Sequence, residues 1–177
     1  MKKNICLFGR SGIGKTTLTR KLCDFLGYEP LVTSQILLEY ATVDERFGDE
    51  LSILVKNNDM IPPHFLEHAL DLKLRNLDLE SGFVVDNPMY KAQYDIYKSF
   101  VGLDYNFLLD ASSDVAESRS QKDDEKKLKR EKFFNIHTVP LIHHLGTDII
   151  TIDASQDQES VFEQVLQICC RNDILLG

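Results

Sequence analysis

Short apolar runs along this chain alternate with longer stretches in which apolar residues recur three or four positions apart. The short runs are typical of buried strands, and the longer stretches are typical of amphipathic helices. Strands that alternate with helices form a parallel sheet with helices packed on both of its faces. The pattern therefore predicts an α/β fold. Its five predicted strands are residues 4–8, 31–33, 83–85, 105–109 and 148–152.

The helix after the first strand is predicted over residues 15–26, with Gly27 as the residue that ends it. Its apolar residues recur at helical spacing and should form one buried face. That predicted face comprises Leu18, Leu22, Phe25 and Leu26.

The longest segment between predicted strands covers residues 34–80 and contains three helical stretches, at about 34–45, 47–57 and 62–79. A crossover between parallel strands needs only one helix. We therefore expect this segment to form a small helical subdomain that closes over a site at the edge of the sheet.

A glycine-rich loop joins the first predicted strand to the first predicted helix. Residues 9–16 fit the phosphate-binding pattern G-x-x-x-x-G-K-[ST], in which Lys15 reaches the β- and γ-phosphates and Thr16 binds Mg²⁺. The glycines let backbone N–H groups surround an anion, and the start of the helix favours the same charge. The strand–loop–helix order favours this function over a turn that binds nothing. The predicted ATP-binding residues are Gly9, Arg10, Ser11, Gly12, Ile13, Gly14, Lys15, Thr16 and Thr17.

An acidic residue, Asp86, directly follows the predicted strand 83–85. Ligands of parallel sheets bind beyond the carboxyl ends of the strands. A carboxylate at the end of a buried strand is costly unless it has a cationic partner. Beside a phosphate-binding loop, we expect that partner to be Mg²⁺, which prefers oxygen ligands. The alternative is that Asp86 caps the next helix.

Two arginines, Arg119 and Arg130, lie eleven residues apart in predicted helices. Phosphoryl transfer places negative charge on oxygens that arginine contacts through two N–H groups. The alternative, common in an acidic protein, is that both are ordinary surface residues.

Composition narrows the class of protein. The formal net charge of −8 argues against nucleic acid as a general partner. No apolar run has the length of a membrane span, and the N-terminus lacks the cleavage site of a secretory signal.

His64 and His68 lack further ligand candidates and are interpreted as a surface pair. We expect a cytoplasmic protein with free thiols at Cys6, Cys23, Cys169 and Cys170.

Beyond the phosphate-binding loop, several stretches resemble the nucleoside monophosphate kinases, and the adenylate kinase group in particular. The resemblance covers nearly the whole chain. Its main elements are residues 31–37, the loop 56–62, residues 82–86 followed by Pro88 and Gln93, then Arg119, the acidic pair 123–124, Arg130 and residues 138–142.

The resemblance implies a fold and a set of roles. The fold would be a single P-loop NTPase domain over residues 1–177, with three α/β/α layers and a five-stranded parallel sheet. It would carry an inserted acceptor-binding subdomain at about 34–80 and a vestigial lid at about 119–124. Lys15, Arg119 and Arg130 would stabilise the transferred phosphoryl group of ATP, and Thr16 and Asp86 would hold Mg²⁺. The acceptor would contact Thr33, Gln35, Pro88, Lys91 and Gln93.

The departures from the family fall mainly on the acceptor side. Leu38 and Met89 stand where the family has arginines that bind the acceptor phosphate, and Asn87 replaces a glycine. Lys91 is the nearest replacement, although lysine offers a point charge and not a fork of N–H groups. Either Lys91 and Arg10 compensate for the lost arginines, or the acceptor differs.

Three functions therefore stay open. The first is a nucleoside monophosphate kinase with an AMP-like acceptor, and the second is a P-loop kinase of a nucleoside or another small molecule. The third is a nucleotide-binding protein with little turnover, which contacts a partner through its helical subdomain.

Overall fold

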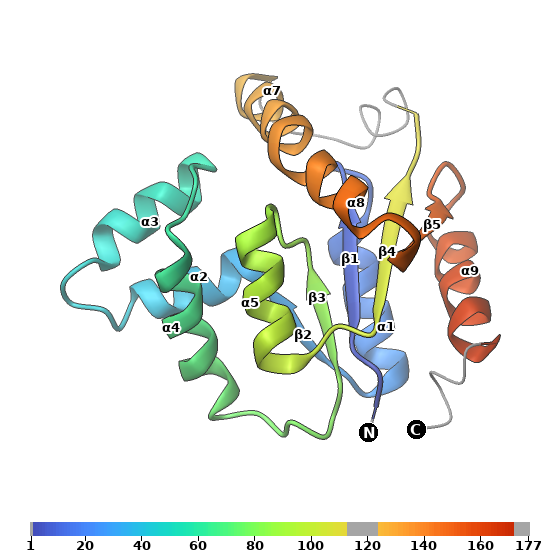
Figure 1. Ribbon diagram of the computed structural model, residues 1–177, viewed down its shortest axis with the longest axis horizontal. Helices are drawn as coiled ribbons and strands as arrows, with labels where there is room; N and C mark the ends of the chain where they lie inside the picture. Colours follow the sequence, from blue (N-terminus) through green and yellow to red (C-terminus); the bar gives the residue numbers. More distant parts are fainter. Residues whose placement is uncertain (1, 113–123, 172–177) are drawn as a thin grey trace.

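A computed structural model describes residues 2–112 and 124–171, and these residues form an α/β fold (Figure 1). Five parallel strands pair in the order β2-β3-β1-β4-β5. The predicted three-layer P-loop architecture with a five-stranded parallel sheet is confirmed, and each strand lies within two residues of its predicted start. The strands are β1 (Ile5–Gly9), β2 (Glu29–Val32), β3 (Phe83–Asp86), β4 (Tyr105–Asp110) and β5 (Ile149–Asp153).

Helices follow the strands and also fill the long segment between β2 and β3. A π-helical turn, Phe134–Thr138, joins α7 to α8, and a short 3₁₀ turn, Gly146–Asp148, leads into β5. The described α-helices are α1 (Lys15–Leu26), α2 (Thr33–Ala41), α3 (Gly48–Asn57), α4 (Pro63–Leu74), α5 (Lys91–Val101), α7 (Asp124–Phe133), α8 (Val139–Leu145) and α9 (Gln158–Arg171).

The sheet has a hydrophobic core on each face, because successive side chains of a strand point to opposite sides. On β1, Cys6 and Phe8 pack into the core shared with α2, α4 and α5. Ile5 and Leu7 pack into the opposite core with α1 and α9. A strand that is covered on both faces is apolar throughout, which is why β1 appears in the sequence as an unbroken apolar run.

Helix α1 has the predicted bounds, and it ends at Gly27, whose backbone adopts φ +62° and donates its N–H to the carbonyl of Cys23. Leu18 and Leu22 are buried as predicted, but Phe25 is 61% exposed. Its ring meets the edge of Phe162 on α9 at the margin of the sheet, with ring centroids 5.8 Å apart. The expected apolar face is thus wrong at Phe25, since α9 covers only part of that end of α1.

Helices α2, α3 and α4 lie together beside the β2 edge of the sheet (Figure 1). Leu37, Leu51, Leu66 and Leu70 are buried where these helices meet the sheet-side core. Helix α4 ends at Leu74, earlier than the predicted 79, and a series of turns leads from there to β3.

The cysteines are free thiols, as predicted: Cys6, Cys23 and Cys169 are buried and Cys170 is exposed. Burial raises the pKa of the Cys6 thiol well above its ordinary value, so this side chain stays neutral. Over residues 2–112 and 124–171, no helix combines the length and the apolar character that crossing a membrane requires.

Gly48 at the start of α3 provides a test of this packing. A Cβ atom at this position would overlap the backbone carbonyl oxygen of Ala41 at the end of α2. Alanine normally stabilises a helix relative to glycine by about 1 kcal/mol. Because the neighbouring backbone must shift, we expect Gly48→Ala to lower the free energy of unfolding by about 1–3 kcal/mol.

Chemical denaturation of the wild type and Gly48→Ala measures this change. Ser52→Ala, on the same helix, is the control and should be neutral or slightly stabilising. A Gly48→Ala variant as stable as Ser52→Ala would show that α2 and α3 do not approach this closely.

Candidate active site

A cavity of about 370 Å³ opens beyond the carboxyl ends of β1, β2 and β3. The sheet order places β3 between β1 and β2, so residues that follow these three strands meet at one edge. Asp86 pairs in register with Leu7 of β1 and with Val32 of β2. The glycine-rich loop therefore begins beside Asp86 on one side, and α2 begins beside it on the other.

The glycine-rich loop has the backbone conformation that its sequence predicts. Gly9, Gly12 and Gly14 have φ values of +151°, +87° and +109°. At Gly9 a Cβ atom would lie 2.8 Å from the carbonyl oxygen of Leu109, so the loop also packs tightly against β4. Gly14 precedes the first turn of α1, whose N-terminus has no side-chain cap. The N–H groups of that turn are therefore available to an anion.

The ammonium group of Lys15 is held at this loop. Its Nζ atom donates to the carbonyl oxygens of Gly9 at 2.6 Å and Arg10 at 2.8 Å. The side chain thus folds back over the loop and keeps its positive charge where the loop would surround a phosphate.

Thr16 and Asp86 join the loop to the end of β3. The Thr16 hydroxyl donates to Oδ2 of Asp86 at 2.9 Å. Asp86 is only 5% exposed, and this burial raises the pKa of its carboxyl, while the charge of Lys15 and the Thr16 hydrogen bond lower it. Burial has the larger effect, so the ionised carboxylate is held in an unfavourable environment that a bound cation would relieve.

The donor set fits Mg²⁺. A hydroxyl and a carboxylate oxygen converge beside a phosphate-binding loop, and Mg²⁺ typically takes one or two protein oxygens together with phosphate oxygens and water. The described parts of the chain contain no group of three or more His, Cys, Asp or Glu side chains that could hold a metal ion. His64 and His68 are both exposed on α4, as expected of a surface pair.

Two predicted acceptor-binding residues, Thr33 and Gln93, also line the cavity, and the Thr33 hydroxyl donates to the backbone carbonyl of Asp86 at 3.4 Å. The Thr33 hydroxyl lies 3.0 Å from the hydroxyl of Tyr97. The Gln93 side-chain oxygen accepts the backbone N–H of Met89 at 2.9 Å, which fixes the orientation of its amide. Both side chains are almost fully buried and therefore form a rigid wall.

Arg130 reaches the cavity from α7. Its Nε atom donates to Oδ1 of Asn58 at 3.0 Å, and the neighbouring Lys129 pairs with Asp59 at 2.6 Å. These contacts tie α7 to the loop after α3. Asn58 has φ +53°, and its Nδ2 atom is buried without a hydrogen-bond partner in the described structure.

Other predicted site residues lie elsewhere. Gln35 is exposed on α2, and Pro88 is buried within the loop after β3. Lys91 begins α5, pairs with Asp95 one turn later at 2.6 Å, and lines a separate cavity of about 390 Å³ with Met60 and His137. Lys91 therefore does not replace the missing arginines in the cavity described above.

Arg10 also lies outside the main cavity. It forms an ion pair with Glu131 of α7, and its guanidinium lies 5.3 Å from the ring centroid of Phe134. Arg119 and residues 119–123 of the predicted lid lie outside the described residues.

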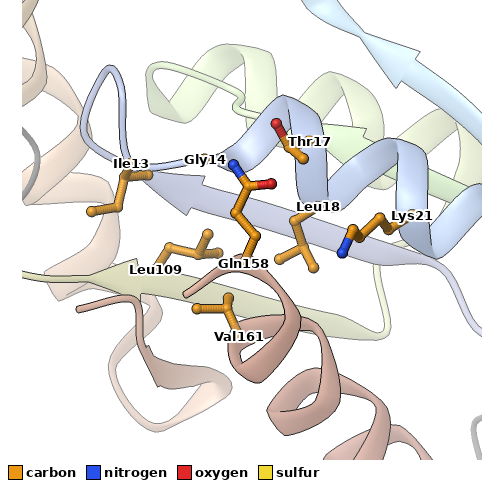
Figure 2. Close-up of a pocket in the computed structure, with 8 residues that line it drawn as sticks. All are labelled: Ile13, Gly14, Thr17, Leu18, Lys21, Leu109, Gln158 and Val161. Atoms are coloured by element: carbon orange, nitrogen blue, oxygen red, sulfur yellow. The ribbon is translucent and has the colours of Figure 1, made fainter. Parts of the chain in front are cut away.

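Thr17 does not line the main cavity. It lines a small hollow between the start of α1, the end of β4 and the start of α9, where the side-chain amide of Gln158 lies near Gly14 (Figure 2). A volume of about 10 Å³ leaves room for about one water molecule at most. Lys21 at its margin pairs with Glu159 at 2.5 Å. The predicted ATP-binding residues therefore line more than one cavity.

Sequence reasoning missed several polar residues that line the main cavity, among them Lys56 and Asn58. Both fall in the stretch 56–62 that resembles the family, but their roles depend on how the end of α3 is oriented. The only local signal is that Asn58 follows the last turn of α3, where asparagine commonly adopts a left-handed conformation.

The buried carboxylate of Asp86 makes a prediction about stability. Its pKa is raised above the ordinary value of 3.8, so the folded protein binds this proton more tightly than the unfolded chain does. The contribution of Asp86 to stability is therefore lost as the pH rises from about 4 through the raised pKa. We expect Asp86→Asn to unfold at a higher denaturant concentration than the wild type at pH 7, and the gain to shrink toward pH 4.

Denaturation curves at the two pH values measure this change. Asp24→Asn, an exposed substitution on α1 with the same change in net charge, is the control and should stay within about 0.5 kcal/mol of the wild type. An Asp86→Asn variant that is less stable than the wild type at pH 7 would contradict the argument.

Comparison with known proteins supports the resemblance that the sequence predicted. No family model matches the chain. Curated adenylate kinases of Mycobacterium sp. (strain MCS) and Mycobacterium ulcerans (strain Agy99) are 26% and 25% identical to it. That of Mycobacterium tuberculosis (strain ATCC 25618 / H37Rv) is 24% identical. Each alignment covers 92% of this chain and 97% of the relative. Together with the parallel sheet and the phosphate-binding loop, this end-to-end similarity supports an adenylate kinase-like phosphotransferase of the nucleoside monophosphate kinase type.

Proposed function

We propose that the protein transfers the γ-phosphoryl group of ATP to a nucleoside monophosphate, with an AMP-like acceptor favoured. The observation that carries this proposal is a single cavity shared by donor-side and acceptor-side residues. Lys15, Thr16 and Asp86 line it together with Thr33 and Gln93, and Arg130 reaches it from α7. Two substrates bound in one cavity can react directly, without a covalent enzyme intermediate.

On the donor side, the N–H groups of the glycine-rich loop and Lys15 would bind the β- and γ-phosphates. Thr16 and Asp86 would hold Mg²⁺, which supplies neutralising charge to the phosphates of bound ATP. The 2.9 Å contact between Thr16 and Asp86 supports this role, because it brings the two oxygen ligands together before any ligand binds.

In the transfer itself, an oxygen of the acceptor phosphate attacks the γ-phosphorus in line with the bond to the β–γ bridging oxygen. The new P–O bond forms as that bond breaks, and ADP leaves with the electron pair. Negative charge spreads over the equatorial oxygens during this step. Arg130 would stabilise this charge, and no side chain needs to act as a nucleophile.

The acceptor end suits a planar base. Leu37, Leu38, Val55, Ile61 and Met89 give the cavity an apolar wall, and the buried amide of Gln93 stands beside it. The curated relatives are named adenylate kinases, which supports an adenine nucleotide as the acceptor to test first.

One observation favours a second candidate, a kinase of a nucleoside or another small hydroxyl compound. Leu38 and Met89 both line the cavity, so the two positions where the family has arginines are apolar at the site itself. Each lost charged hydrogen bond costs roughly 1.5–3 kcal/mol of acceptor-phosphate binding. An uncharged acceptor would not need this interaction.

An ATP-consumption assay with Mg²⁺ separates these functions. AMP, CMP, UMP, GMP and dTMP are each tested beside the corresponding nucleoside. Turnover that requires a monophosphate would support the first proposal and identify the acceptor, while turnover with nucleosides alone would support the second. ATP binding without turnover on any compound would overturn both and favour a nucleotide-binding protein.

The role of Arg130 makes a further prediction. Because its guanidinium would stabilise charge mainly in the transition state, we expect Arg130→Ala to lower kcat by about a thousandfold and to leave ATP affinity nearly unchanged. Steady-state kinetics together with ATP titration measure both quantities. Lys132→Ala, an exposed residue two positions away on the same helix, is the matched control. A loss of less than about tenfold would mean that Arg130 only tethers α7 to Asn58.

A further inference from the structure

The acceptor end of the cavity needs a source of positive charge. A phosphate monoester carries between one and two negative charges at neutral pH, and its transfer into a largely apolar cavity is costly without a cationic partner. Leu38 on α2 and Met89 after β3 supply none, and Lys91 lies in another cavity. If the proposed function is correct, the charge must come from a different element of the fold.

Among the described residues that line the cavity, the cations are Lys15, Lys56 and Arg130. Lys15 is bound to the carbonyl groups of the glycine-rich loop, and Arg130 is bound to Asn58. Lys56 differs from both, since within residues 2–112 and 124–171 its ammonium group forms no ion pair or hydrogen bond. It is the cation at this cavity that a ligand can engage without breaking an existing contact.

The residues that follow Lys56 tie the end of α3 to α7. Lys56 lies in the last turn of α3, two residues before Asn58, which binds Arg130, and three before Asp59, which pairs with Lys129. These two contacts hold the end of α3 against α7. Asp59 is the nearest carboxylate that follows Lys56 in the chain, and it is paired with Lys129. Asp59 therefore does not compensate the charge of Lys56.

Asn58 adds an independent observation. Its side-chain oxygen accepts from Arg130, so the amide cannot be reversed without losing that hydrogen bond. Among the described residues, the Nδ2 atom then has no hydrogen-bond partner, and it is a buried donor beside the cavity. A buried donor of this kind is unfavourable until it finds an acceptor, and a phosphate oxygen is a strong one.

We propose that Lys56, assisted by Arg130 and the amide of Asn58, binds the phosphate of the acceptor nucleotide. The family binds that phosphate through arginines at the positions of Leu38 on α2 and Met89 after β3. In this protein the contact would come instead from the C-terminal end of α3. The acceptor is a phosphate monoester whose phosphate lies at the end of α3, and whose base packs against the apolar wall formed with Leu38 and Met89. This inference rests on the proposed function, because it assigns the acceptor of the same reaction.

A lysine near a helix C-terminus also has a purely structural explanation, since its charge favours the negative end of the helix dipole. The two explanations predict different results for Lys56→Gln. A structural role changes stability and leaves the kinetics alone. A role in acceptor binding raises KM for the acceptor and leaves the unfolding midpoint near that of Lys132→Gln, an exposed lysine on α7 that makes the same charge change.

Steady-state kinetics on the full chain test the proposal. With saturating Mg²⁺ and ATP, we expect Lys56→Gln to raise KM for the best monophosphate acceptor by about 10- to 100-fold, as expected for one lost charged hydrogen bond. The KM for ATP should not change, and Lys56→Arg should restore most of the acceptor affinity. An acceptor KM for Lys56→Gln within twofold of that for Lys132→Gln would overturn the proposal.

Calorimetry separates a failure of this inference from a failure of the proposed function. The affinity of the wild type for AMP is compared with its affinity for adenosine, without ATP and therefore without turnover. If the wild type prefers AMP and Lys56→Gln loses that preference, Lys56 binds phosphate whether or not transfer occurs. If the preference persists in Lys56→Gln, or if the wild type binds both compounds equally, the assignment of Lys56 is wrong even if phosphoryl transfer is confirmed.

Discussion

The burial of Asp86 at the carboxyl end of β3 is the constraint on which the site depends. Its backbone pairs with Leu7 of β1 and Val32 of β2, so the register of both neighbouring strands fixes the position of the carboxylate along β3. Thr16 then reaches it at 2.9 Å from the first turn of α1. A shift of one residue in either register would turn the Asp86 side chain to the opposite face of the sheet. The phosphate-binding loop and the start of α2 are therefore positioned by the same pairing.

The fold could be predicted from the sequence because its strands are short, apolar and buried on both faces. Such runs as Ile5–Phe8 and Phe83–Val85 have few alternatives once helical patterns separate them. The errors occurred where packing overrides periodicity. Phe25 has helical spacing with Leu18 and Leu22, but its exposure depends on how far α9 extends over α1. The early end of α4 at Leu74 likewise reflects turns that the leucine spacing cannot reveal.

The site could be predicted only in part. The parts built from residues close together in the chain were predictable, and the parts built from residues far apart in the chain were not. The glycine-rich loop is a local motif, so its conformation follows from eight consecutive residues. The acceptor side is assembled from α2, α3, α5 and α7, and a side chain there can face either of two cavities. Lys91 and Lys56 look equally suitable in the sequence, yet only Lys56 lines the cavity that contains Asp86. That distinction depends on helix orientation, which a single sequence does not contain.

The same contacts that orient the end of α3 also couple acceptor binding to the position of α7. Arg130 is held by Asn58 alone among the described residues, through one hydrogen bond to a neutral amide. A phosphate offers a charge-assisted and bidentate alternative, which is the stronger interaction. Arrival of the acceptor would therefore draw Arg130 from Asn58 toward the phosphate, which the Nδ2 donor of Asn58 would contact as well. The exposed pair between Lys129 and Asp59 would keep α7 nearby during this exchange, because such pairs are weak enough to adjust, at about 0.2–1 kcal/mol. The charge on the acceptor would thus provide the driving force for assembling its own binding site.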